Sequence, residues 1–216
     1  MVERSGRFRV YRVVESVRHV NLQAVDSAQL YTVYESGYAD IQPAVDDLTT
    51  GDLVAATLAG DPDADEEPWR LTDVERVGGV AMDFAVGVEP PDVAREAWTP
   101  GLTEPVVTVL EEDGEPVGAC CVQPRDPLPG GAFVPNVLTG VLPLESTLSA
   151  VPGVGGPATE VLVLDPDQPD ATSYSLPYGV LVCFTAAADR LVAEFRHRYD
   201  CPRHEDTRPE FDPYGV

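Results

Sequence analysis

Hydrophobic and polar positions alternate along the first third of the chain with the period of two that is typical of half-buried β-strands. Three runs rich in Val, Tyr, Phe and Leu predict three strands over residues 7–37, namely RFRVYRVVES, HVNLQAVD and AQLYTVYESG. The apolar residues of 40–48 recur instead at helical spacing behind Asp40, a residue type that caps helices. GDLVAATLAGD and PWRLTDVERVG predict two more strands, so the expected element order is β-β-β-α-β-β.

The remainder of the chain predicts an α+β domain with a mixed or antiparallel sheet. Strands are expected in VAMDFAVGV, in a hairpin of VVTVLEE and PVGACCVQP, and in TEVLVLD and YGVLVCF. Helices are expected in PPDVAREAW, LPLESTLSAV and, as a C-terminal amphipathic helix, TAAADRLVAEFRHRY. PRDPLPGGAFVPN and VPGVGGPATE predict loops, because neither holds a phosphate-binding glycine motif. The flexible pair Gly78-Gly79 divides the chain into expected domains of residues 1–78 and 79–216.

The charge of the chain indicates a protein adapted to high salt rather than an ordinary acidic protein. Its 37 Asp and Glu residues face 14 basic residues, all of them Arg, and the net charge is −23. Repulsion between so many like charges destabilises a compact state in dilute salt and is screened at molar salt. An acidic composition without Lys is similar to that of haloarchaeal proteins and predicts a halophilic, cytoplasmic protein; the alternative is a mesophilic acidic protein that lacks Lys by chance. No apolar run reaches the length of a spanning helix, so no membrane association is expected.

The order β-β-β-α-β-β resembles the OB-fold, a small five-stranded Greek-key barrel. The resemblance covers residues 1–78 and rests on the helix between the third and fourth strands and on the acidic turn DPDADEE between the fourth and fifth. It implies a face on which aromatic side chains stack bases and Arg contacts phosphate. The alternative is a small meander sheet capped by one helix. The whole chain is similar to the uncharacterised haloarchaeal families of unknown function, and that resemblance carries no catalytic residue.

A relatively basic stripe on the first strand is the best candidate for a binding face. Residues 1–40 hold five Arg and five acidic residues, so this segment is neutral and the rest of the chain carries the net charge. Strand parity predicts that Phe8 and Val10 enter the core and that the alternate residues project to the other side. The candidate binding residues are Arg7, Arg9, Tyr11, Tyr31 and Tyr34. The alternative is that the tyrosines are half-buried strand residues and the arginines pair with local acids.

The octapeptide HRYDCPRH, residues 197–204, raises the question of a metal site. Its H-x3-C-x2-H spacing is compatible with zinc ligation by His197, Cys201 and His204. The pattern is also typical of a helix end, because Pro202 stops a helix and basic residues in a last turn complement its dipole. The second interpretation is favoured, and we expect neither a metal nor another cofactor.

The sequence therefore predicts a non-catalytic binding or accessory protein, with single-stranded nucleic acid or a protein as its partner. The vicinal pair Cys120-Cys121 and Cys183 are expected to be reduced, buried strand residues rather than nucleophiles. The alternative is an enzyme of unknown reaction with a site between the two domains, built from Asp165, Tyr178, Arg190 and His197.

Overall fold

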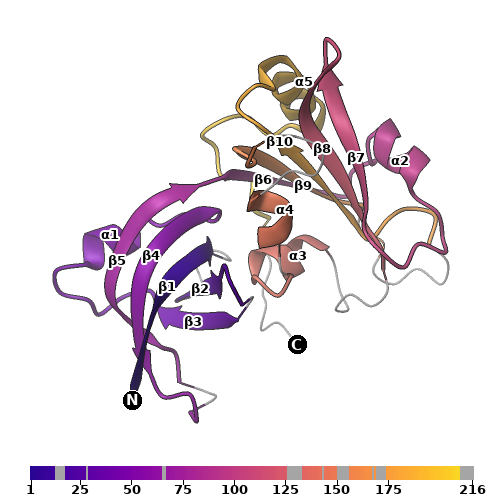
Figure 1. The fold of residues 1–216 in the computed structure, drawn as a ribbon. Helices are drawn as coiled ribbons and strands as arrows, with labels where there is room; N and C mark the ends of the chain where they lie inside the picture. The colour runs from indigo at the N-terminus through magenta and orange to yellow at the C-terminus, as the bar shows by residue number, and fades with distance from the viewer. Residues whose placement is uncertain are drawn as a thin grey trace. The chain divides into compact units, whose positions relative to one another are not determined.

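The computed structural model describes residues 1–12, 18–27, 29–64, 67–125, 133–142, 144–149, 156–166, 168 and 174–209 (Figure 1). The chain divides into two compact units, the first of residues 1–81 with 137–145 and the second of residues 82–136 with 146–216. The expected boundary was after Gly78, and the first segment of the first unit ends at Ala81. The return of residues 137–145 to the first unit was not expected, because the sequence pattern carries no sign of it.

The first unit is a five-stranded antiparallel sheet with one short helix, and its elements occur in the expected order. They are β1 (Val2–Tyr11), β2 (His19–Ala24), β3 (Leu30–Tyr34), α1 (Gln42–Asp46), β4 (Asp52–Gly60) and β5 (Arg70–Gly79). The strands follow the spatial order β3-β2-β1-β4-β5, which Figure 1 shows as one strongly curved sheet. The helix begins after Ile41 rather than at the predicted cap Asp40.

The core of the first unit lies on the inner face of this curved sheet. Phe8 and Val10 of β1 are buried there, as their parity predicts, with the alternating apolar residues of β2 and with Val45 of α1. The two edge strands approach at a single parallel bridge between Val33 and Trp69. Among the described residues the ladder therefore does not close into a barrel, which corrects the expectation of one.

The second unit is α+β and also contains one five-stranded sheet. Its elements are β6 (Ala81–Val86), α2 (Asp92–Ala97), β7 (Val106–Glu112), β8 (Glu115–Gln123), α3 (Phe133–Leu138), α4 (Glu145–Ser149), β9 (Glu160–Asp165), β10 (Gly179–Phe184) and α5 (Asp189–Tyr199). The strand order is β6-β9-β10-β8-β7. The chain passes from the second unit to the first within α3, after Asn136. It returns to the second unit within α4, after Glu145. Within the described parts of the chain, no helix is both long and apolar enough to cross a membrane.

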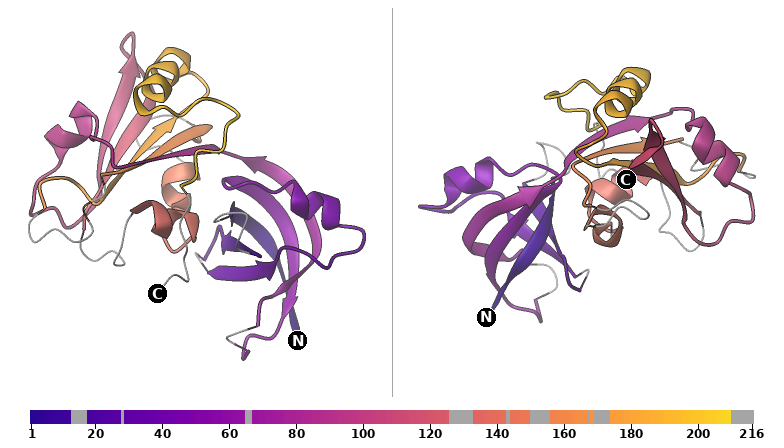
Figure 2. Two further views of the ribbon diagram at one scale, coloured as in Figure 1. Left: turned by 180° about the vertical axis from the view of Figure 1, so that it is seen from behind. Right: turned by 45° about the horizontal axis from the view of Figure 1, so that its top comes forward.

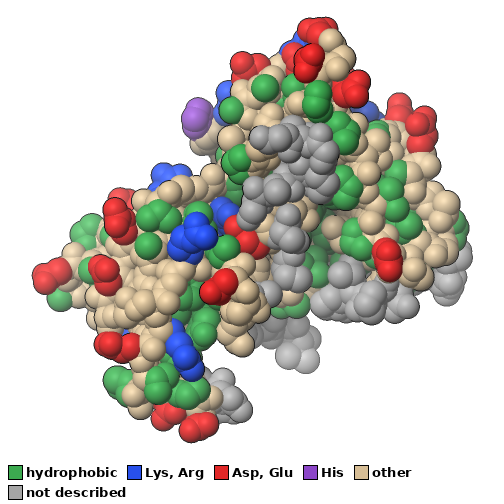
Figure 3. Space-filling view, viewed as in Figure 1, with side chains coloured by type: hydrophobic (Ala, Val, Ile, Leu, Met, Phe, Trp, Pro, Cys, Tyr) green, Lys and Arg blue, Asp and Glu red, His purple; other side chains and the backbone are tan. Residues whose placement is uncertain are grey.

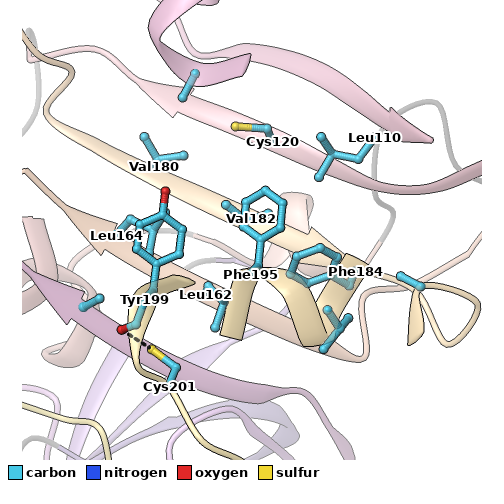
Figure 4. Close-up of a cluster of buried hydrophobic side chains, with 14 of the residues drawn as sticks. Leu110, Cys120, Leu162, Leu164, Val180, Val182, Phe184, Phe195, Tyr199 and Cys201 are labelled. Atoms are coloured by element: carbon cyan, nitrogen blue, oxygen red, sulfur yellow. Dashed lines mark hydrogen bonds between the residues drawn. The ribbon is translucent and has the colours of Figure 1, made fainter. Parts of the chain in front are cut away.

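Helices α2 and α5 contribute to a core on one face of the second sheet, and Figure 2 shows α5 lying across the strands. The apolar stripe of α5 packs Val192, Phe195 and Tyr199 onto strand residues such as Val182 and Phe184 (Figure 4). β9 and β10 are buried along almost their whole length, which explains their continuous apolar sequences. Helix α5 begins at Asp189, after the expected cap Thr185, because the preceding residues form a turn.

Helix α3 corrects the loop predicted over PRDPLPGGAFVPN for its last four residues, whereas residues 126–132 of that segment lie outside the described residues. The ring of Phe133 lies against Gly179 so closely that a Cβ on that glycine would come within 2.1 Å of it. The same ring packs edge-on against Tyr178, with centroids 5.5 Å apart. Burial of one aromatic ring and a tertiary contact thus outweigh the poor helix propensity of this segment.

Candidate functional site

The outer face of the first sheet holds the predicted Arg and Tyr residues of β1. Phe8 and Val10 point into the core, so Arg9 and Tyr11 point to the opposite face. Their parity is confirmed, but Arg9 is only 5% exposed and Tyr11 is fully buried, whereas Arg7 is exposed. This corrects the expectation of an open stripe. A segment distant in sequence covers this outer face of β1. The alternation of apolar and polar residues within β1 gives no information about that contact.

The covering segment is held through its main chain. We call it the strap; its described residues are 139–142, 144 and 145. The side-chain amide of Gln23 donates to the carbonyl oxygens of Gly140 at 2.8 Å and Leu142 at 3.4 Å. The amide of Asn21 donates to the carbonyl oxygen of Thr139 at 2.9 Å. The strap is not extended, since residues 139–140 form a turn and Leu142 lies in a bend. Because these contacts are made to backbone carbonyls, this face holds the strap largely through its main chain.

A bidentate ion pair fixes the end of the strap. The Arg9 guanidinium donates to both carboxylate oxygens of Glu145, at 2.9 Å from Nε and 2.8 Å from Nη2, and Nη1 donates to the carbonyl oxygen of Gly51 at 2.8 Å. Both side chains are largely buried, which makes this charge-assisted pair stronger than a surface one. At the other end, Gly140 has a φ of +72° and lies against the ring of Tyr11.

Two polar atoms on this face are left without a partner. The Tyr11 hydroxyl and the side-chain oxygen of Gln23 are buried and make no hydrogen bond within the described residues. Burial raises the pKa of the Tyr11 phenol. A buried polar group left unsatisfied costs about 1–3 kcal/mol. The face therefore offers more hydrogen-bonding capacity than the strap uses.

The two predicted tyrosines of β3 lie on opposite faces of the sheet. Tyr31 packs edge-on against Phe8 at 5.8 Å and Trp69 at 5.1 Å between ring centroids, as part of the inner core. Tyr34 has the opposite parity and is partly exposed. The prediction that Tyr31 joins the same surface as Tyr11 is corrected, because adjacent strands pair Tyr31 with the core residue Leu22.

Tyr34 belongs to a small aromatic and cationic patch. The Arg70 guanidinium lies 5.4 Å from the ring centroid of Tyr34 and 5.2 Å from that of Tyr38, and it donates to the carbonyl oxygen of Gly37 at 2.6 Å. His19 lies 6.0 Å from Tyr34 between ring centroids. The sequence did not group these residues, because they come from three strands and a loop.

The octapeptide HRYDCPRH forms the end of α5 and the chain beyond it, as the favoured interpretation predicts. Cys201 is buried, and its thiol lies in weak hydrogen-bond contact with the carbonyl oxygen of Tyr199 at 3.4 Å (Figure 4). The carbonyl oxygen of Phe84 is a second acceptor at 3.8 Å. His197 and His204 are exposed. Across the described ranges, no group of three or more His, Cys, Asp and Glu is placed to hold a metal ion.

Arg196, inside the last turn of α5, explains how this end of the chain is held. Its guanidinium forms buried ion pairs with Asp83 on β6 and, at 2.8 Å, with Glu160 on β9. It also donates to the carbonyl oxygen of Cys201 at 2.8 Å. Such a network is costly to break, because removing the cation leaves the buried carboxylate of Asp83 without its ion-pair partner, whereas Glu160 keeps its pair with Arg203.

All four cysteines are buried and reduced, in agreement with the expected structural role of the strand cysteines. Cys120 faces the core beneath α2 and α5, and burial raises the pKa of its thiol to about 12. A hydrogen bond between the thiols of Cys121 and Cys183 lowers the pKa of the former and raises that of the latter. Neighbouring Cys120 and Cys121 point to opposite faces of the sheet.

The structure brings together only some of the residues of the predicted enzyme site. Asp165 ends β9 and Tyr178 precedes β10, and these antiparallel neighbours place both residues at one end of the second sheet. Arg190 lies on α5, where it pairs with Glu112 at 3.3 Å, and His197 is exposed on the same helix. The four residues therefore do not form one constellation.

Sequence reasoning missed two residues beside Asp165 and Tyr178. Asn136 donates its side-chain amide to the Tyr178 hydroxyl, and the guanidinium of Arg125 lies 3.6 Å from the ring centroid of Tyr174. A single Arg or Asn in a Pro-rich stretch forms no motif, so the sequence offered no signal. Strand pairing alone brings these residues to the same end of the sheet.

Comparison with known proteins identifies a family. A family model described as a family of unknown function (DUF6663) matches residues 1–204, and the chain belongs to that family. No curated protein and no solved structure matches the chain. The geometry of the two units therefore carries the functional argument.

Proposed function

We propose that this protein is a non-catalytic binding protein whose first unit recognises a short segment of a protein partner on the outer face of β1, β2 and β3. The observation that supports this most directly is the strap itself. A turn-forming piece of chain already occupies the face, held by side chains that donate to its backbone carbonyls. Hydrogen bonds to the main chain are a common source of affinity when proteins bind peptides.

The strap indicates what kind of segment fits. A residue with a side chain does not fit at the Gly140 position without displacing Tyr11, because a Cβ there would come within 2.8 Å of the ring. Leu142 and Leu144 are both almost fully buried. Five residues after the glycine, Glu145 meets Arg9. The matching partner segment has a glycine, apolar side chains after it and a carboxylate at its end.

The two unpartnered atoms favour a partner over a purely structural strap. Tyr11 and Gln23 retain hydrogen-bonding groups that the strap does not satisfy. A segment that offered a donor to Gln23 and an acceptor to Tyr11 would recover part of the desolvation cost. Such a segment can displace the strap with a favourable free energy even though it repeats the other contacts.

Two broader expectations belong to the same proposal. The first unit is OB-like: β1 pairs with β2 and β4, the helix lies between β3 and β4, and β3 meets the start of β5 in parallel. The protein is also halophilic and works in a salt-rich cytoplasm, in support of which Figure 3 shows acidic side chains spread over the visible surface. The net charge of −23 without Lys supports this too.

Peptide binding to a chain with a weakened strap tests the proposal. Glu145→Arg places two guanidinium groups together and releases the strap. In molar KCl this variant should bind a labelled peptide of the sequence VLTGVLPLEST, and wild-type protein should bind it far more weakly. Glu115→Arg, a charge reversal at an exposed turn, is the matched control and should behave like wild type. The proposal fails if hydrogen exchange shows the strap released in Glu145→Arg but no peptide binds.

A second candidate function is binding of single-stranded nucleic acid, which the patch of His19, Tyr34, Tyr38 and Arg70 favours. Stacking of a base on such a ring contributes about 1–3 kcal/mol and tolerates salt better than phosphate contacts do. Tyr34→Ala should then weaken oligonucleotide binding, measured by fluorescence anisotropy, at low and at molar KCl alike. Tyr174→Ala, an exposed tyrosine of the second unit, is the control. If wild-type protein, Tyr34→Ala and Tyr174→Ala bind the oligonucleotide equally well, the patch is not the nucleic-acid binding site.

A further inference from the structure

The end of the second sheet where β8 and β9 finish and β10 begins gathers several polar side chains. Gly179 of β10 pairs with Gln123 of β8, and the backbone N–H of Tyr178 donates to the carbonyl oxygen of Gln123 at 3.1 Å. Arg125 follows that strand closely in sequence. Strand pairing therefore fixes Arg125 near Tyr178 without requiring any local motif.

Arg125 is held in an unusual state for an arginine of an acidic protein. Its guanidinium stacks 3.6 Å from the ring centroid of Tyr174 and lies 5.8 Å from that of Tyr178. Its Nε is buried without a hydrogen-bond partner, and no carboxylate pairs with it among the described residues. Burial lowers the pKa of the Arg125 guanidinium.

Other stacked or buried arginines show what Arg125 lacks. Arg70 also lies over tyrosine rings, but it donates to the carbonyl oxygen of Gly37 at 2.6 Å. Arg9 and Arg196 are buried, and each meets carboxylates. Near Arg125 the carboxylate of Asp165 accepts the backbone N–H of Val134 at 2.9 Å. A half-buried cation that is stacked on a ring and has a buried Nε donor without a partner is complementary to an oxyanion.

We propose that Arg125, held flat against Tyr174, binds the oxyanion of a small ligand at this end of the second sheet. The guanidinium edge presents donors in the fork geometry that matches a carboxylate or a phosphate group, while the tyrosine ring covers its face. The site is independent of the peptide-binding face, because its residues all belong to the second unit. Ligand binding would add a directly hydrogen-bonded anion to a guanidinium that interacts with the carboxylate of Asp165 only through its charge.

NMR of the full chain with isotope-labelled arginine tests this site. Potassium phosphate and potassium acetate are titrated separately in molar KCl at constant ionic strength, and the Nε–H signals are followed. We expect a saturable shift of the Arg125 signal, and the anion that saturates it at the lower concentration distinguishes a phosphate from a carboxylate ligand. Arg70 is the internal control, because it shares the tyrosine stack but has its own acceptor. A linear drift, or equal shifts at Arg70 and Arg125, would overturn the proposal.

Two variants separate the roles of cation and ring. Arg125→Gln should weaken binding roughly tenfold or more, because it removes the charge-assisted hydrogen bonds. Tyr174→Leu keeps the guanidinium and alters a partly exposed ring, so it should fold and bind about two- to fivefold more weakly. Unchanged affinity in Tyr174→Leu, with the Arg125 shift intact, would overturn the role of the ring.

Discussion

Substitution of Gly140 by alanine is the sharpest structural test of the strap, because the added methyl group causes both backbone strain and steric overlap. The residue has a φ of +72°, a conformation that non-glycine residues rarely adopt. The added Cβ would lie 2.8 Å from the ring of Tyr11 and 3.0 Å from Leu30. Tyr11 is fully buried, so its ring has little room to move away.

The magnitude follows from these two costs. A left-handed conformation costs a non-glycine residue about 1–2 kcal/mol. Overpacking of a well-packed site adds about 1–3 kcal/mol. We therefore expect Gly140→Ala to lower the free energy of unfolding by about 2–5 kcal/mol, measured by urea titration in molar KCl. For a chain of this length the same loss lowers Tm by about 4–20 °C.

Two control variants separate the contributions. Gly87 has a φ of +69° with no atom within 4 Å of the position of a Cβ, so Gly87→Ala measures backbone strain alone. Gly101 has open space and an ordinary φ, so Gly101→Ala should change stability by less than about 1 kcal/mol. If Gly140→Ala costs no more than Gly87→Ala, contact between the strap and Tyr11 does not stabilise the first unit and the reasoning is wrong.

Three further results are expected. Arg196→Met should cost about 3–5 kcal/mol of unfolding free energy, because it leaves the buried carboxylate of Asp83 without its ion-pair partner, whereas Arg190→Met at an exposed pair should cost less than about 1 kcal/mol. The melting temperature should rise with KCl concentration, and a flat or falling dependence would contradict adaptation to salt. Burial raises the pKa of Cys120 to about 12 and of Cys201 to about 11, so native protein near neutral pH should react slowly with iodoacetamide; rapid labelling of either thiol would contradict its burial.

Elements with a clear period could be predicted from the sequence. The alternation in β2, with Val20, Leu22 and Ala24 on one face, gives the strand and its buried side together. The spacing of Val192, Phe195 and Tyr199 likewise gives α5 and its core-facing stripe. These signals are local, because each depends on residues that lie close together in the chain.

The strap and the Arg125 site could not be predicted in this way. The burial of Tyr11 depends on Gly140, and no pattern near either residue reports that contact. The segment LPLESTLSAV was predicted as one helix, whereas the observed helix begins at Glu145, because the carbonyl oxygen of Leu142 in the bend before it accepts a hydrogen bond from Gln23 of β2. Arg125 becomes noticeable only when strand pairing places it beside tyrosines from another part of the chain.

The first unit is assembled from two pieces of chain, and this sets the order of events during translation. When Ala81 leaves the ribosome, the outer face with Tyr11 and Gln23 still lacks its cover. At ordinary synthesis rates, roughly 60 more residues must be added before Glu145 follows, which takes on the order of ten seconds. During that interval the outer face of the nascent chain is uncovered, so a partner of the proposed kind would have its best opportunity to bind before the protein completes its own fold.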